Sequence, residues 1–154
     1  MAALPELCIR PARRSDLEAV ARVWHESASS MDGSPPVPPI ADMRRRIDDE
    51  LASGWDLHVA IRDERIIGML ALNLAEARLD QIFVLPSEQG TGVGRALIEA
   101  AKKRMPAGFR LRMAAANEAA AAFYRKAGFA TVGEGFHPSS GVPVRFLGWT
   151  PGKI

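Results

Sequence analysis

Apolar residues recur at three- and four-residue spacings in four segments of the chain, and this periodicity predicts four amphipathic helices. The first helix is expected over residues 17–28, after the capping-box pattern Ser15-x-x-Glu18, and the second over residues 40–51. The third is expected over residues 93–105 and the fourth from Asn117 to Gly128. Each helix has one apolar face, so each should dock on another layer of the fold.

Short apolar or alternating runs between these helices predict seven strands. They are expected over residues 7–10, 55–62, 65–73, 79–84, 109–114, 129–132 and 144–149. Asp63 and Glu64 should join the second and third strands as a hairpin. The order is strand, two helices, three strands, helix, strand, helix and two strands, without an internal repeat or a linker. This order predicts a single domain over residues 1–154 with a mixed α/β layer architecture.

Composition excludes several classes of protein. The 154 residues carry 20 Lys and Arg against 18 Asp and Glu, without the clustered basic stripe that is typical of nucleic-acid binding. The longest uncharged stretch, residues 66–75, is too short to span a membrane. Cys8 is the single cysteine, no metal-ligand spacing is present, and the first residues do not resemble a signal peptide. We therefore expect a cytoplasmic protein without a metal, a membrane or a nucleic-acid partner.

The stretch Gln89-Gly-Thr-Gly-Val-Gly94 lies between an expected strand and an expected helix. Free backbone amides and the positive end of the helix dipole meet there, which favours an anion such as phosphate. The glycines Gly90, Gly92 and Gly94 would let the main chain turn through positive φ and approach a pyrophosphate closely. A tight turn without a ligand is the alternative. Arg95 and Ala96 follow Gly94, so neither a P-loop nor a Rossmann fingerprint is present.

Two motifs together resemble the GCN5-related N-acetyltransferase (GNAT) family. The glycine motif appears as Gln89-x-x-Gly92-x-Gly94, after Ile82-Phe-Val-Leu-Pro86, and the second motif as Asn117, Tyr124, Gly128 and Phe129. The element order fits this family over nearly the whole chain. The resemblance implies a central, mostly antiparallel, twisted sheet of six to seven strands flanked by about four helices.

The resemblance also implies an activity, which is acetyl-CoA-dependent N-acetyl transfer to a primary amine of a small molecule or peptide, by direct attack in a ternary complex. A non-catalytic acyl-CoA-binding module of the same fold is the alternative, and a homodimer is left open. The residues that the resemblance places around the coenzyme are Ile82, Phe83, Val84, Gln89, Gly90, Thr91, Gly92, Val93, Gly94, Arg95, Asn117 and Tyr124.

Asn117 and Tyr124 should share a helix face, because seven residues complete nearly two turns. An Asn amide can both donate to and accept from pantetheine, and the Tyr124 phenol can protonate a departing thiolate as general acid. For each residue the alternative is structural, as an N-cap for Asn117 and as a packed aromatic for Tyr124. Cys8 is expected to pack in the core.

The general base is not identified by the sequence. Family members that acetylate ribosomal protein N-termini have a Glu five residues before the Asn, whereas this chain has Arg112 there. The candidate bases are Asp80, Glu76, His58 and His137, each of which could act through water or could simply be solvated. The acceptor should bind between variable loops, here residues 29–39 and 134–144.

Overall fold

The computed structural model describes residues 5–31 and 36–152, which form one seven-stranded sheet with four α-helices. The elements are β1 (Leu7–Pro11), α1 (Leu17–Ser29), α2 (Ile40–Ala52), β2 (Asp56–Arg62), β3 (Arg65–Asn73), β4 (Arg78–Val84), α3 (Val93–Arg104), β5 (Phe109–Ala114), α4 (Glu118–Lys126), β6 (Ala130–Phe136) and β7 (Pro143–Trp149). The predicted order of elements and the predicted mixed α/β fold are confirmed.

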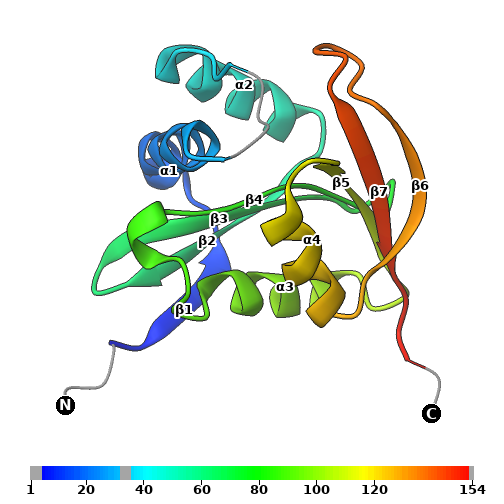
Figure 1. The fold of residues 1–154 in the computed structure, drawn as a ribbon. Helices are drawn as coiled ribbons and strands as arrows, with labels where there is room; N and C mark the ends of the chain where they lie inside the picture. The colour runs from blue at the N-terminus through cyan, green and yellow to red at the C-terminus, as the bar shows by residue number, and fades with distance from the viewer. Residues whose placement is uncertain (1–4, 32–35, 153–154) are drawn as a thin grey trace.

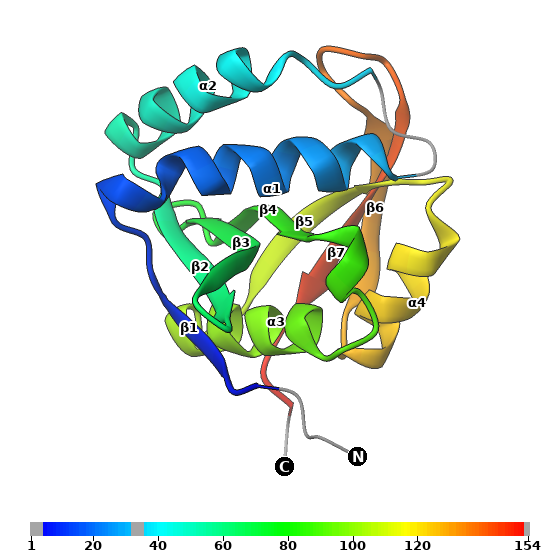
Figure 2. The ribbon, with the colours of Figure 1, turned by 90° about the vertical axis from the view of Figure 1, so that its left-hand side faces the viewer.

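The helices lie on both faces of the sheet (Figure 1). Helices α1 and α2 are on one face, with α1 against the strands and α2 packed on α1, and helices α3 and α4 are on the other (Figure 2). The periodic apolar positions explain this packing. Val20 and Trp24 of α1, Ile47 of α2 and Leu97 of α3 are all buried in one core.

The strands follow the order β1-β2-β3-β4-β5-β7-β6, and every neighbouring pair is antiparallel except β4 and β5. The parallel pair is joined only at Arg78 with Arg110 and at Leu79 with Leu111. Beyond these two positions β4 continues to Val84 and β5 to Ala114 without pairing to each other. The two strands therefore diverge and leave a gap in the sheet, which we call the β4–β5 gap.

Local sequence signals explain the turns around this frame. Asp63 and Glu64 both have positive φ, as a tight turn between paired strands requires, so the predicted hairpin of β2 and β3 is confirmed. Gly128 follows α4 with a φ of 96°, as a left-handed C-terminal turn.

Three details of the sequence prediction are wrong. Cys8 is exposed on the edge strand β1 and does not pack in the core. The Ser15–Glu18 capping box does not form, because a short 3-10 turn over Arg14–Asp16 precedes α1 and the Asp16 carboxylate instead accepts a hydrogen bond from the Arg13 amide at 2.7 Å. Strand β6 extends to Phe136, four residues beyond the expected end, since pairing with β7 holds a polar, glycine-containing segment that has no strand pattern of its own.

Residues 5–31 and 36–152 contain no helix that has both the length and the apolar character needed to cross a bilayer.

Candidate active site

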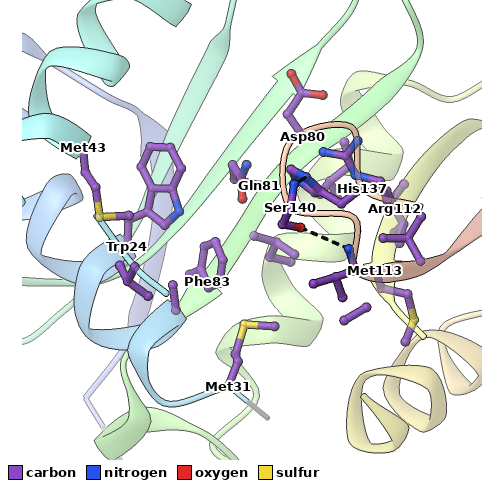
Figure 3. A pocket seen from close by; sticks show the side chains of 18 of the residues that line it. Trp24, Met31, Met43, Asp80, Gln81, Phe83, Arg112, Met113, His137 and Ser140 are labelled. Atoms are coloured by element: carbon purple, nitrogen blue, oxygen red, sulfur yellow. Dashed lines mark hydrogen bonds between the residues drawn. The ribbon is translucent and has the colours of Figure 1, made fainter. Parts of the chain in front are cut away.

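A cavity of about 590 Å³ lies where β4 and β5 diverge (Figure 3). One end, the α1–α2 end, is lined by residues of these two helices, by the segment 36–38 and by the loop after β6. The other end, the α4 end, is lined by Ala120 and Tyr124. Since α4 covers the opposite face of the sheet from α1 and α2, the cavity reaches through the β4–β5 gap.

The backbone of β4 borders this gap. The Leu85 amide donates to the Ile67 carbonyl at 2.9 Å, so Leu85 faces β3. Because backbone groups alternate along a strand, Phe83 also faces β3, whereas Ile82 and Val84 direct their amides and carbonyls toward the gap. All three residues were expected around the coenzyme. In the structure Phe83 contributes its side chain to the cavity lining instead.

The end of β4 is closed by side chains. The Val84 carbonyl accepts a hydrogen bond from the Ser27 hydroxyl at 3.0 Å and one from the Gln89 side-chain amide at 3.3 Å. Gln89, the first residue of the glycine motif, thus ties the glycine stretch to the strand. Its side chain is engaged with the protein backbone, and it positions the stretch that follows.

The glycine stretch turns sharply into α3 and leaves backbone amides unpaired there. Gly90 and Gly92 have φ values of 79° and 91°, and a Cβ atom added at either would meet nothing within 4 Å. Gly92 is the residue before α3, and the first amide bonded back to it belongs to Ala96, at 3.1 Å. The amides at the start of α3 therefore point out of the helix into open space.

Gly94 serves a different purpose from the one expected. It does not have a positive φ, and a Cβ atom there would lie 3.3 Å from the Phe123 ring. The prediction that all three glycines turn through positive φ is therefore wrong for Gly94. This glycine allows the first turn of α3 to approach α4 closely, and the α4 residue that it contacts is next to Tyr124.

An arginine that the sequence analysis did not single out braces the glycine stretch. Arg62, at the end of β2, is 8% exposed and donates to the Glu88 carboxylate at 3.1 Å and to the Thr91 hydroxyl at 3.0 Å. The Thr91 hydroxyl in turn donates to the Glu88 carbonyl at 2.6 Å. The Thr91 side chain is therefore already engaged, which leaves the backbone amides of the stretch as its free donors.

Asn117 and Tyr124 occupy the two ends of α4. The Asn117 side-chain oxygen accepts a hydrogen bond from the Ala120 amide at 3.0 Å, so the residue is the N-cap of α4, and it lies outside the lining of the cavity. Tyr124 is 8% exposed and lines the cavity, with its ring edge-to-face against Phe123 and Phe129. Burial raises the pKa of the Tyr124 phenol, which keeps it protonated. Within residues 5–31 and 36–152 the hydroxyl has no hydrogen-bond partner.

Asp80 is the candidate base on β4, and it lines the cavity. One carboxylate oxygen accepts a hydrogen bond from the Trp55 indole nitrogen at 2.9 Å, and the other accepts one from Arg78. The Asp80 side chain is 14% exposed and is therefore fixed in position at the edge of the cavity. Glu76 is exposed in the turn between β3 and β4 and does not line the cavity.

The two candidate histidines lie in different places. His58 is buried outside the cavity, where its Nε2 atom lies 2.9 Å from the Asp56 carboxylate that Arg104 also binds. His137 lines the α1–α2 end. Its Nδ1 atom accepts hydrogen bonds from the Ser139 and Ser140 amides at 3.1 and 3.2 Å, so the neutral ring carries its proton on Nε2.

Several charged residues of the cavity had no sequence signal. Asp42, Arg46 and Glu50 of α2 line the α1–α2 end, together with Arg112 of β5, at the position that the sequence analysis compared with a family Glu. The guanidinium of Arg46 lies 5.2 Å from the centre of the Trp24 ring. Along a helix these charges are typical of a solvated face, and only the fold shows that the face borders a cavity.

Comparison with known proteins identifies acetyltransferases both by family and by individual relatives. The family model described as an acetyltransferase (GNAT) domain matches residues 35–140, more than half of the chain. The peptidyl-lysine N-acetyltransferase YjaB of Escherichia coli K12 is 29% identical over 146 residues, and the match covers 92% of this chain and 94% of YjaB.

Solved structures show the same fold. The solution structure of apo-form YjaB from Escherichia coli has a TM-score of 0.73 at 25% identity, covering 96% of this chain and 99% of that one. A second similar structure is that of yncA, described as a putative acetyltransferase from Salmonella typhimurium with its cofactor acetyl-CoA. Its TM-score is 0.74 at 13% identity, and the match covers 96% of this chain and 95% of yncA. The family prediction is thus confirmed, and with it the prediction of an N-acetyltransferase. This chain belongs to the GNAT acetyltransferase family.

Proposed function

We propose that the protein transfers an acetyl group from acetyl-CoA to a primary amine of a small molecule or peptide, by direct attack in a ternary complex. One observation carries this proposal: the cavity lies at the β4–β5 gap and is lined by residues from helices on both faces of the sheet. The coenzyme can approach from the α4 end and the amine from the α1–α2 end. Two substrates held at one gap gain the rate advantage of proximity without a covalent intermediate on the protein.

The coenzyme is proposed to bind along β4 and at the start of α3. The amides after Gly90 and Gly92 are free to bind a pyrophosphate. The backbone of Ile82 and the amide of Val84 face the gap, where pantetheine could pair with them, whereas the Val84 carbonyl is already bound by Ser27 and Gln89. An amide of the same strand edge would stabilise negative charge on the thioester oxygen. Asn117 keeps a side-chain NH2 group beyond its capping bond, and this group remains a candidate partner of the pantetheine arm.

Proton transfer is assigned to two side chains of the cavity. Tyr124 is proposed to protonate the departing thiolate, because it lines the cavity and burial raises the pKa of its phenol, so the proton is present throughout the neutral range. Asp80 is proposed to take the amine proton through water. Of the candidate bases it lines the cavity and keeps free lone pairs, whereas Nδ1 of His137 already accepts two hydrogen bonds.

The experiment has two parts. Calorimetric titration with acetyl-CoA should show binding, and saturation at a hundred times the dissociation constant should stabilise the fold by about 2.7 kcal/mol. A panel of amines and peptides is then assayed for coenzyme A release. Binding with release identifies an enzyme, and binding without release from any amine favours the non-catalytic acyl-CoA-binding module. The absence of binding would refute both.

A further inference from the structure

We propose that the α1–α2 end of the cavity binds a carboxylate between Arg46 and Arg112, so that the acceptor is a small amine with a carboxylate group and an apolar body. This inference rests on the proposed function, whose acceptor it specifies. An α-amino acid with an apolar side chain has this chemistry. Its acetylated product would be an N-acetyl amino acid.

Two arginines of the α1–α2 end are not paired with the acidic side chains, Asp42 and Glu50, that line the same end. Arg46 and Arg112 line the cavity, and in the described part of the chain neither forms an ion pair. Arginine presents a planar fork of donors that matches a carboxylate. The charges of both arginines act on His137, which lines the same end, so the two guanidinium groups could hold one anion there.

Two of the three acidic residues in the lining of the cavity are bound by arginines other than Arg46 and Arg112. Asp80 is bound by Arg78, and Asp42 by Arg45. The pKa of Arg78 is raised, chiefly by its hydrogen bond to Asp80 and further by the charges of Glu76 and Glu50. Asp80 and Glu50 thus place negative charge near Arg78, whereas Arg46 and Arg112 have no acidic partner at ion-pair distance in the described residues. A molecule with an ammonium and a carboxylate group matches this separation of charge.

His137 adds a third donor beside the two arginines. Its Nδ1 atom is occupied by two backbone amides, so its remaining ring nitrogen, Nε2, carries a proton. The pKa of His137 is lowered by burial and by the nearby charges of Arg112 and Arg46, which keeps the ring neutral. Figure 3 shows His137 and Arg112 on the same side of the cavity.

The opposite wall is apolar. Trp24, Met31, Met43 and Phe83 line the cavity across from Arg112 and His137 (Figure 3). Such a wall favours an acceptor with an apolar body. The carboxylate site is also separate from the expected pyrophosphate site, because residues 89–95 do not line this cavity and open α3 on the other face of the sheet.

The test compares carboxylate probes with their amides. N-acetyl-L-methionine and N-acetyl-L-methioninamide are titrated into protein saturated with coenzyme A, and L-methionine and L-methioninamide are compared as acceptors. The amino group of L-methioninamide is less basic than that of L-methionine and is more often neutral. Intrinsic reactivity alone therefore favours L-methioninamide. We expect the carboxylate of each pair to bind or react about ten- to a hundredfold better.

The variants Arg46→Gln and Arg112→Gln should each remove most of this preference. Both residues are exposed, and the contact that Arg46→Gln removes is the one with the face of the Trp24 ring, so the fold should be kept. The matched control is Arg110→Gln, because Arg110 lies on the same strand as Arg112, is also exposed and does not line the cavity. The control should keep the preference. All three variants should bind acetyl-CoA as the parent protein does.

Equal affinity for the N-acetyl carboxylate and its amide would overturn the inference, as would an unchanged preference in both Arg46→Gln and Arg112→Gln. Turnover of neutral amines or of an end-capped lysine peptide at the rate of L-methionine would also overturn it, while leaving the proposed acetyl transfer intact. If the carboxylate probe binds through the two arginines but no amine releases coenzyme A, the proposed function fails and the anion site stands.

Discussion

The two ends of the cavity are built from different kinds of polar group. The α4 end and the adjoining glycine stretch use backbone amides, glycines and a buried phenol, which are fixed by helix packing and by Arg62. The α1–α2 end uses exposed charged side chains, above all Arg46 and Arg112, beside the segment 36–38 and the loop after β6.

This difference matches two different tasks. Backbone amides at a helix start recognise a phosphate group whatever the rest of the ligand is. They are held in place by the helix, so no free energy is spent on orienting them when the ligand binds. Side chains on a helix face and in loops can be exchanged without changing the frame of the fold, so they suit the recognition of a particular acceptor. Changes at the first end should therefore affect the coenzyme or the chemistry, and changes at the second should affect the choice of acceptor.

The largest effect is expected from Tyr124→Phe. The substitution removes one hydroxyl and keeps the ring contacts with Phe123 and Phe129. If the phenol is the general acid, the single-turnover rate with a confirmed acceptor should fall by about 10² to 10⁴. The Kd for acetyl-CoA should barely change. In the parent protein the raised pKa of this phenol should prevent any loss of rate from its ionisation up to about pH 10. A parent-like rate in Tyr124→Phe would make Tyr124 structural.

Gly92→Val should weaken acetyl-CoA binding by about a hundredfold or more, equivalent to about 2.7 kcal/mol. The branched side chain would occupy the open space before α3, where the pyrophosphate is expected. The matched control is Gly54→Val, because Gly54 also has a positive φ and open surroundings but lies in the turn after α2. Calorimetry should show the loss in Gly92→Val alone, although both variants carry similar backbone strain. Equal losses would mean that strain, and not the site, weakens binding.

Arg62→Met should have an intermediate effect. The variant loses the hydrogen bonds of Arg62 to Glu88 and Thr91, which hold the glycine stretch in place. The stretch would then have to become ordered when the coenzyme binds, and this cost should reduce the affinity for the coenzyme by about tenfold. The KM for acetyl-CoA should rise while kcat changes little, since Arg62 lies outside the cavity. Arg65→Gln, an exposed arginine of the same hairpin, is the control. A fall in kcat with an unchanged KM would contradict the positioning role.

The smallest effect concerns the pH dependence of stability at His137. The folded pKa lies below the ordinary value of 6.5, so as the pH falls through that value the unfolded chain takes up a proton that the folded protein does not. The free energy of unfolding should therefore decrease toward acid pH. His137→Asn keeps a hydrogen-bond acceptor for the Ser139 and Ser140 amides without titrating. Denaturant unfolding at about pH 7.5 and about pH 5.5 should show a smaller difference in the variant. If the free energy of unfolding changes equally between the two pH values in the parent protein and in His137→Asn, His137 does not contribute to the pH dependence of stability.

The sequence was sufficient for the parts of the molecule that local patterns determine. The face of α3 formed by Val93, Leu97, Ala101 and Met105 is buried as its periodicity predicts, and the turn at Asp63 and Glu64 joins the two strands expected there. The glycine stretch was also found, because a strand, glycines and a helix start are consecutive in the chain. The separate function of Gly94 was missed, since its partner Phe123 is brought to it only by packing.

The acceptor end could not be found in this way. Arg46 and Glu50 are ordinary charges on an amphipathic helix, and they border a cavity only because α2 packs over α1 beside the β4–β5 gap. The bracing hydrogen bonds of Arg62 likewise link it to Glu88 and Thr91, which lie 26 and 29 positions further along the chain, in the turn before α3. Among the candidate bases, His58 and Glu76 were chosen by residue type, and the fold places both outside the cavity.

The central claim is that acetyl transfer is direct, between two substrates that meet at the β4–β5 gap. Its most direct test is the initial-rate pattern for a confirmed acceptor, measured at several fixed concentrations of acetyl-CoA. A ternary complex predicts double-reciprocal lines that intersect, because both substrates must be bound before either product leaves. Parallel lines would reveal an acetylated protein intermediate and would contradict the account.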